Sequence, residues 1–321
     1  MVCGIFLVCS AIFAGCSMEN SAKHETVQLT YVIWDKNQKP GMDAIAEAFH
    51  EENPDIVVDV QVVPWGQYWT KLEANAASNT MPDVCWMHSQ SFLRYVNQGF
   101  LLDLTDWFDV TDAMSHVPQE LAALYSKQGR VYAMPKDYDT IGLWYNKALF
   151  DEKGIAYPDE NWDWGTLLEA AKKLTDPAKG IYGIMAPPDQ QSFYYTLVYQ
   201  NGGEILHPDQ QASGYDEVAT QQAVQFAVDL SRKYHLSPTV QQFASQTREQ
   251  YFMSGKAAMG FFGSWMLADF KANEYVAKNC DVAVLPRGKR QATIYNGLGN
   301  AVAAGTKHPA EAVRFVRFLS G

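Results

Sequence analysis

Strand-like and helix-like segments alternate along the first hundred residues, and this alternation restricts the possible folds more than any other feature of the chain. Residues 27–34 and 56–63 are apolar at every second position, as half-buried strands are, and residues 83–87 form a third apolar run. A helical pattern follows each run. Such alternation is typical of βαβ units, so we expect an α/β fold with mostly parallel sheets flanked by helices.

The ends of these three predicted strands are the first place to expect a binding site. Ligands of parallel sheets bind outside the carboxyl ends of the strands. Those ends fall at residues 34–36, 64–68 and 86–90, where Trp, Tyr, His and amide side chains gather.

Residues 131–150 do not fit a simple continuation of this pattern. Two apolar, β-prone runs, 131–134 and 141–145, flank a polar link, 135–140, that contains no glycine. A charged link without glycine is less typical of a hairpin turn than of a crossing between two bodies. An ordinary surface loop is the alternative that this local pattern leaves open.

The alternation resumes after this link and continues to the last residue. We expect helices at 147–153, 164–174, 191–200 and 216–234, strands at 181–186, 256–262, 281–285 and 295–304, and a last helix opened by Pro309. Asp163 and Ser264 are expected N-caps, and Thr247 with Gln250 forms an expected capping box. A length of 321 residues favours about two domains.

Composition and missing motifs exclude several classes of function. The net charge of −11 disfavours a nucleic-acid partner, because phosphate binding needs a cationic face. The chain has no GxSxG, Walker A or HExxH motif, and a lone His88 without a nucleophile motif is better interpreted as a hydrogen-bonding residue. Cys85 and Cys280 are expected to be buried free thiols, and no Cys/His spacing predicts a metal site. No cofactor is expected.

The N-terminus has the pattern of an export signal. Residues 2–15 form an uncharged apolar run that is too short to span a bilayer, and polar sequence follows it. Residues 13–16, Phe-Ala-Gly-Cys, resemble a bacterial lipobox, although Phe13 replaces the usual Leu and no basic residue precedes the run. We therefore expect a signal peptide at 1–15, lipidation of Cys16 and a tether at 16–26. The alternative is a buried first strand or helix.

Four motifs, taken in order, resemble one protein family. They are Pro-x-Asp-Tyr-Asp-Thr-x-Gly-Leu-x-Tyr-Asn-Lys-x-Leu-Phe at 135–150, Asn-Trp-Asp-Trp at 161–164, Phe-Met-Ser-Gly-Lys-Ala-Ala-Met at 252–259 with Gly-Ser-Trp at 263–265, and His-Pro-Ala-Glu-Ala at 308–312. Together they resemble the extracellular solute-binding proteins, family 1, of bacterial sugar ABC transporters, from about Leu29 to Gly321.

The resemblance implies a two-lobed fold of the type II periplasmic-binding-protein kind, with a ligand cleft between the lobes. On that template the first lobe comprises residues 27–139 and 285–321, and the second lobe comprises residues 140–284. Family members usually continue with a stretch that returns to the second lobe. The resemblance therefore implies that this chain is truncated at its C-terminus.

The resemblance also implies a sugar as the ligand, and a sugar needs aromatic rings on its C–H faces and planar hydrogen-bonding groups around its edge. Trp265 is the main candidate for a stacking ring, and an ordinary core Trp is the alternative. The glycines at 297 and 299 are candidates for close backbone approach. The full candidate set is Trp34, Asp35, Lys36, Tyr68, His88, Ser89, Asp137, Tyr138, Asp139, Gln191, Tyr195, Trp265, Gly297, Gly299 and Asn300, with Trp65, Gln67 and Gln90 in the same strand-end loops.

Two functions from different classes remain open at this point. The first is a non-catalytic, monomeric sugar-binding protein, anchored by lipid outside the cytoplasmic membrane, which delivers its ligand to permease subunits. The second is a secreted glycosidase that uses two carboxylates such as Asp137 and Asp139, since residues two apart on an extended segment share a face. The sequence does not identify the sugar.

Overall fold

The computed structural model describes residues 26–207 and 212–321, and the expected signal peptide and Cys16 lie outside this part. The strands are β1 (Val27–Ile33), β2 (Ile56–Val62), β3 (Val84–His88), β4 (Ser126–Lys127), β5 (Arg130–Val131), β6 (Met134–Asn146), β7 (Met259–Gly263), β8 (Cys280–Ala283) and β9 (Tyr295–Val302). No described helix is both long enough and apolar enough to cross a membrane.

Helices occupy most of the remaining chain. They are α1 (Lys39–Glu52), α2 (Trp65–Ala77), α3 (Ser89–Asn97), α4 (Val110–Ala113), α5 (Gln119–Leu124), α6 (Lys147–Lys153), α7 (Trp164–Leu174), α8 (Tyr195–Gln200), α9 (Val218–Arg232), α10 (Val240–Ser245), α11 (Arg248–Met253), α12 (Leu267–Ala272), α13 (Glu274–Asn279) and α14 (Pro309–Phe318). A π-helical turn, Gln190–Tyr194, precedes α8.

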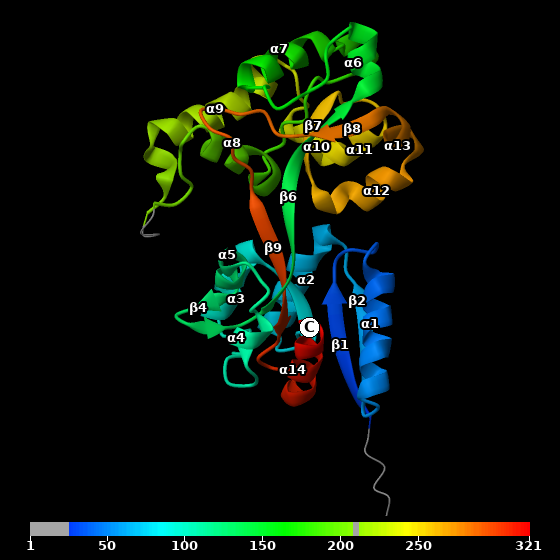
Figure 1. Ribbon diagram of the computed structural model, residues 1–321, viewed down its shortest axis with the longest axis vertical. Coiled ribbons are helices and arrows are strands. Elements are labelled where there is room, and N and C mark those ends of the chain that lie inside the picture. The colour runs from blue at the N-terminus through cyan, green and yellow to red at the C-terminus, as the bar shows by residue number, and fades with distance from the viewer. Residues whose placement is uncertain (1–25, 208–211) are drawn as a thin grey trace, which may run out of the picture.

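The molecule consists of two lobes, one above the other in Figure 1, as the fold class predicted. The buried apolar residues form separate clusters: two are drawn from residues 29–134 and 298–316, and two from residues 141–285. Leu285 packs in the core of the second lobe. After Leu285 the chain enters β9, which pairs with β6 and with β3 of the first lobe.

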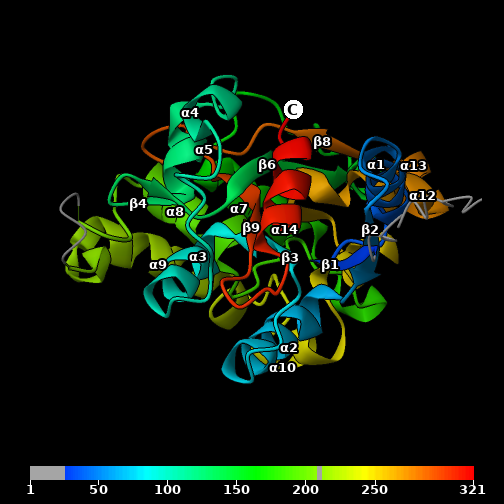
Figure 2. The same ribbon diagram turned by 90° about the horizontal axis from the view of Figure 1, so that it is seen from below.

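The first lobe is built as the alternating pattern predicted. Strands β2, β1 and β3 are parallel neighbours, and β9 joins the edge of β3 in the antiparallel direction. The inward face of β1 carries Leu29, Tyr31 and Ile33, all fully buried. Seen from below in Figure 2, α14 lies under this sheet, where Ala312 and Phe315 pack in the same core cluster as Leu29.

The sheet of the second lobe differs from the expected mostly parallel arrangement. Strands β7 and β8 both run antiparallel to β6. The predicted strand at 181–186 contributes only isolated bridges, an antiparallel one from Ile181 to Asp176 and parallel ones from Tyr182 and Met185. The reason is that the amides between them bond elsewhere: Gly183 donates to Thr175 Oγ1 at 3.0 Å and Ile184 donates to the Leu236 carbonyl at 3.2 Å.

The stretch at 131–150 forms the crossing between the lobes. The polar link, the second apolar run and Met134 from the first run form one continuous strand, β6, which Figure 1 shows running from the lower lobe into the upper one beside β9. The start of the first run, Val131, belongs to the short strand β5 instead. The link pairs antiparallel with β9, from Asp137 opposite Leu298 to Thr140 opposite Tyr295, after a bulge at Pro135. The upper half of β6 pairs with β7 and β8 instead. The surface-loop alternative is therefore wrong.

Candidate functional site

A cavity of about 660 Å³ lies between the two lobes, beside the crossing strands. We call it the cleft. This volume is in the range of small-molecule sites. A second hollow, in the first lobe beside Tyr68 and Leu72, measures only about 150 Å³. The cleft is therefore the better candidate site.

The cleft brings together eight of the predicted site residues from both lobes and from the crossing. They are Trp34, Asp35, His88, Asp137, Tyr138, Asp139, Gln191 and Trp265, and Trp65 from the same strand-end loops joins them. The carboxyl ends of β1 and β3 supply Trp34, Asp35 and His88, as expected for the edge of a parallel sheet.

One wall of the cleft is aromatic and belongs to the first lobe. The ring of Trp34 contacts four others edge-on or tilted, with centroid distances of 5.2 Å to Trp65, 4.9 Å to Tyr68, 6.1 Å to Trp69 and 5.1 Å to Trp86. These contacts fix Trp34, while Trp65 keeps 48% of its surface exposed. The first lobe therefore presents a packed aromatic surface from which the half-exposed ring of Trp65 faces the cleft.

Trp265 lies in the wall that the second lobe contributes and is 37% exposed. Its ring lies over Gly263, where an added Cβ would be 1.9 Å from Trp265 Cζ3. Glycine at 263 is therefore what leaves room for the ring. Ser264 does not cap the turn as expected: Ser264–Met266 is a 3-10 turn without a side-chain cap, and α12 begins only at Leu267.

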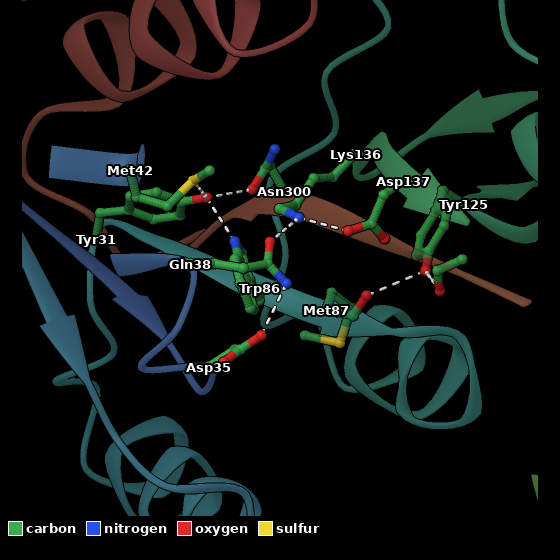
Figure 3. A network of polar contacts seen from close by, with 11 residues as sticks. Tyr31, Asp35, Gln38, Met42, Trp86, Met87, Tyr125, Lys136, Asp137 and Asn300 are labelled. Carbon is green, nitrogen blue, oxygen red and sulfur yellow. Dashed lines mark hydrogen bonds and ion pairs between the residues drawn. The ribbon is translucent and has the colours of Figure 1, made fainter. Parts of the chain in front are cut away.

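A polar network fixes the floor of the cleft near the first lobe, as Figure 3 shows. Lys136 Nζ donates to Gln38 Oε1 at 2.7 Å and pairs with Asp137 Oδ2 at 2.5 Å. The same ammonium lies 4.5 Å from the centre of the Trp86 ring. Gln38 Nε2 in turn donates to Asp35 Oδ2 at 3.0 Å. Asp35 and Asp137 are thus held in fixed positions at the cleft surface.

A second network joins the two lobes through the crossing strand. Gln90 N donates to His88 Nδ1 at 3.2 Å, which leaves the ring proton on Nε2 to donate to Gln191 Oε1 at 3.0 Å. Gln191 Nε2 then donates to Asp139 Oδ1 at 2.8 Å. Burial lowers the pKa of His88, so its ring is neutral at pH 7. This supports the interpretation of His88 as a hydrogen-bonding residue.

The carboxyl group of Asp139 is strongly affected by this environment. Burial, followed by the nearby charge of Asp137, raises its pKa to about 7. The hydrogen bond from Gln191 opposes this rise without cancelling it. Asp139 therefore exchanges between acid and carboxylate near neutral pH.

Four of the remaining candidates are occupied by contacts within the protein. Tyr68 is buried and its hydroxyl donates to the Trp86 carbonyl at 2.7 Å. Asn300 Oδ1 accepts from the Tyr31 hydroxyl at 2.7 Å, as Figure 3 shows. Ser89 Oγ donates to Asn296 Oδ1 at 2.5 Å. Tyr195 packs against the core of the second lobe.

Three further candidates also lie outside the cleft lining. A Cβ at Gly297 would be 2.7 Å from the Asp137 carbonyl, and a Cβ at Gly299 would be 2.9 Å from the Tyr125 ring. Glycine is needed at both positions because neighbouring protein atoms approach the backbone closely there. The sequence predicted that a ligand would make this close approach instead. Lys36 is exposed, and Gln67 and Gln90 are likewise absent from the lining.

Most cleft residues that the sequence did not indicate come from the second lobe. They are Pro187, Asp189, Phe243, Thr247, Arg248, Glu249, Ser264 and Asp269, with Asn37, Gln38 and Leu298 from the first lobe. The capping box of α11 was a usable signal for Thr247, because a helix begins there and its first turn faces the cleft. Phe243 and Asp269 have no comparable local signal.

Among the described residues, one group of side chains that could together bind a metal ion lies outside the cleft lining. Ligand atoms of Glu204, His207 and Glu217 lie within 4.8 Å of one another in the second lobe. The cleft itself has no such group in the described part of the chain.

Comparisons with known proteins agree with this geometry. The model of the family "Bacterial extracellular solute-binding protein" matches residues 35–321. The galactooligosaccharide-binding protein of Bacillus subtilis is 25% identical, over 99% of this chain and 76% of the relative.

Solved structures give the same result. The ABC substrate-binding protein Lmo0181 of Listeria monocytogenes, in complex with cycloalternan, has a TM-score of 0.83 and 27% identity, covering 92% of this chain and 76% of that one. The GacH receptor of Streptomyces glaucescens, solved with and without acarbose, has a TM-score of 0.80 and 26% identity, with the same coverage. The chain thus spans about three quarters of the length of these relatives.

Proposed function

The chain belongs to the bacterial extracellular solute-binding protein family, and we propose that it captures a sugar in the cleft and delivers it to the permease subunits of an ABC transporter. The observation that carries this proposal is the cleft itself. Aromatic faces from both lobes, Trp65 and Trp265, enclose a cavity whose edge carries carboxylates and amides. These are the groups that bind the C–H faces and hydroxyls of a sugar.

The setting of the protein is part of this proposal. Export by residues 1–15, acylation of Cys16 and action as a monomer outside the cytoplasmic membrane fit the family's extracellular role. We propose residues 27–139 and 295–321 for the first lobe and residues 140–294 for the second, with β9 as the return crossing, because Leu285 packs with the second-lobe core.

No structural observation favours the glycosidase alternative. Asp137 is paired with Lys136, and Asp139 accepts a hydrogen bond from Gln191. Product analysis in the experiment below tests for turnover directly.

The test is a titration with a panel of mono- and oligosaccharides, followed by tryptophan fluorescence and calorimetry. We expect at least one sugar to bind without product formation. Trp265→Ala should weaken the binding of that sugar by about 2 kcal/mol or more, roughly a 30-fold rise in Kd, because a stacking ring is lost. Trp107→Ala is the matched control, since Trp107 is 43% exposed and lies outside the cleft lining.

Two results would contradict the proposal. Turnover of a bound sugar would show an enzyme, and unchanged affinity in a folded Trp265→Ala variant would remove the main stacking assignment.

A further inference from the structure

Carboxylates greatly outnumber cationic side chains around the cleft. Six acidic residues contribute to its lining: Asp35, Asp137, Asp139, Asp189, Glu249 and Asp269. Among the lining residues that the structure describes, Arg248 is the one Arg or Lys. A cavity lined by one sign of charge concentrates ligands of the opposite sign.

Arg248 is not available to an anionic ligand. Its Nε pairs with Glu249 Oε1 at 2.7 Å, and its Nη1 lies 3.8 Å from Asp189 Oδ1. The guanidinium lies 5.5 Å from the centre of the Phe262 ring, and only 12% of the side chain is exposed. The single cation of the lining is therefore neutralised within the second lobe.

Lys136 is the second cation close to the cleft, and it is equally engaged. Its ammonium is held by Gln38, Asp137 and the Trp86 ring, as Figure 3 shows, and its side chain is 12% exposed. It neutralises Asp137 from below and is not part of the cleft surface.

Three lining carboxylates have only uncharged partners. Asp35 accepts from the Asn37 amide at 2.8 Å and from Gln38 at 3.0 Å, and Asp139 accepts from Gln191 at 2.8 Å. Asp269, in the opposite lobe, accepts from Asn37 Nδ2 at 3.1 Å. Within residues 26–207 and 212–321, none of the three forms an ion pair with Lys, Arg or His.

From these contacts we propose that the cleft selects its sugar by charge. It binds a saccharide that carries an amino group more tightly than the neutral counterpart, and it rejects one that carries a carboxylate or phosphate. An ammonium gains charge-assisted hydrogen bonds from Asp35, Asp139 or Asp269, whereas an anion loses its hydration beside them without gaining a partner. This inference rests on the proposed function of the cleft as a sugar site.

The first test compares closely related sugars that carry a positive charge, no charge or a negative charge. Glucosamine, glucose and glucuronate, and the matching galactose series, are titrated at pH 7 and low salt, where most of the amino sugar carries its ammonium charge. We expect the amino sugar to bind about threefold to tenfold more tightly than the neutral sugar, and the uronate to bind at least about tenfold more weakly. Uronate binding as tight as that of the neutral sugar would overturn the inference.

The second test needs no sugar, so it separates this inference from the proposed function. Trp34, Trp65 and Trp265 line the cleft. In a Trp107→Phe background, which removes the exposed Trp outside the lining, quenching of tryptophan fluorescence by caesium and by iodide, each measured relative to its quenching of free tryptophan, therefore reports the charge of the cleft. We expect caesium to quench the cleft fraction more than iodide does, and a variant with Asp35→Asn, Asp139→Asn and Asp269→Asn to lose much of this preference.

A variant with Asp59→Asn, Asp112→Asn and Asp159→Asn is the matched control. It carries the same net charge as the cleft variant, and its three positions are exposed and outside the lining. It should keep the preference for caesium. An equal loss in both variants would show that the overall charge, and not the cleft, attracts the cation, and would overturn the inference even if no sugar binds.

Discussion

Asp139 shows how the fold changes the chemistry of a single residue. It lies on β6 at the crossing, next to the buried His88 and Gln191, and its pKa rises to about 7 from an ordinary value of 3.8. Burial is the main cause and the charge of Asp137 is the second. The folded protein therefore holds this proton at pH values where the unfolded chain has released it.

This difference predicts a loss of stability as the pH rises. Because the folded pKa is raised, the contribution of Asp139 to stability is full below about pH 3.8 and is lost as the pH rises through about 7. Between pH 5 and pH 8, Asp139→Asn should gain on the order of 2–4 kcal/mol of unfolding free energy relative to the wild type. Urea unfolding at several pH values measures this.

The control for this prediction is Asp59→Asn, because Asp59 is exposed on β2. Its stability should follow the wild type at every pH. Parallel curves for Asp139→Asn and the wild type would show that Asp139 does not titrate in this range.

The sequence predicted residue types at the cleft better than residue roles. Trp34 and His88 were found because they end parallel strands, which is a local property. Tyr68 and Asn300 carry equally suitable groups, but their side chains bond inside the first lobe, and only the tertiary contacts decide this. Asp269 reaches the cleft from α12, far along the chain, and no local pattern marks it.

At the scale of elements, the capping box of α11 links a confirmed sequence signal to the cleft. Thr247 accepts from Gln250 N at 3.3 Å, and Gln250 Oε1 accepts from Thr247 N at 2.9 Å. The first turn of α11 then places Arg248 and Glu249 in the lining. The cap therefore fixes both the helix and part of the site.

Removal of this cap should affect stability and binding together. Thr247→Ala is expected to lower the free energy of unfolding by about 1 kcal/mol, because the first turn of α11 frays. The affinity for the sugar should fall several-fold for the same reason. Asp163→Ala removes the cap of α7, where Asp163 accepts from Thr166 N at 2.8 Å outside the cleft lining. It should cost a similar stability, and calorimetry should show unchanged affinity. Equal affinity losses in both variants would contradict this account.

The strands at the crossing show where local patterns stop being informative. The sequence of residues 131–146 shows two apolar runs and a polar link. The link is nevertheless part of strand β6, because its backbone pairs with β9, more than a hundred and fifty residues later. Residues 181–186 show the reverse. Their apolar pattern suits a strand. The backbone amides of Gly183 and Ile184, however, donate to Thr175 and Leu236 and not to a neighbouring strand.

At the scale of the whole molecule, the two lobes are joined by β6 and β9 and by a few side-chain bonds across the cleft. His88 of the first lobe donates to Gln191 of the second, and Asn37 donates to Asp269. Gln90 and Gln190 form a longer contact of 3.5 Å. Such bonds exist only while the lobes are close together, so they contribute to the affinity of any ligand that binds the closed form.

Gln191 forms two of these hydrogen bonds at once, since it joins His88 of the first lobe to Asp139 of the crossing strand β6. In the form with the lobes close together, Gln191→Ala leaves His88 and Asp139 without their hydrogen bonds to Gln191, which destabilises that form by about 1–3 kcal/mol. When the lobes are apart, water forms hydrogen bonds with both side chains, so the variant loses nothing there. We expect an affinity loss of about tenfold and a larger radius of gyration without ligand, measured by small-angle X-ray scattering. Saturating sugar should restore the wild-type radius. Gln241→Ala, at an exposed position on α10 outside the cleft lining, is the control and should change neither quantity. The same behaviour in Gln191→Ala would show that lobe closure does not depend on this chain of hydrogen bonds.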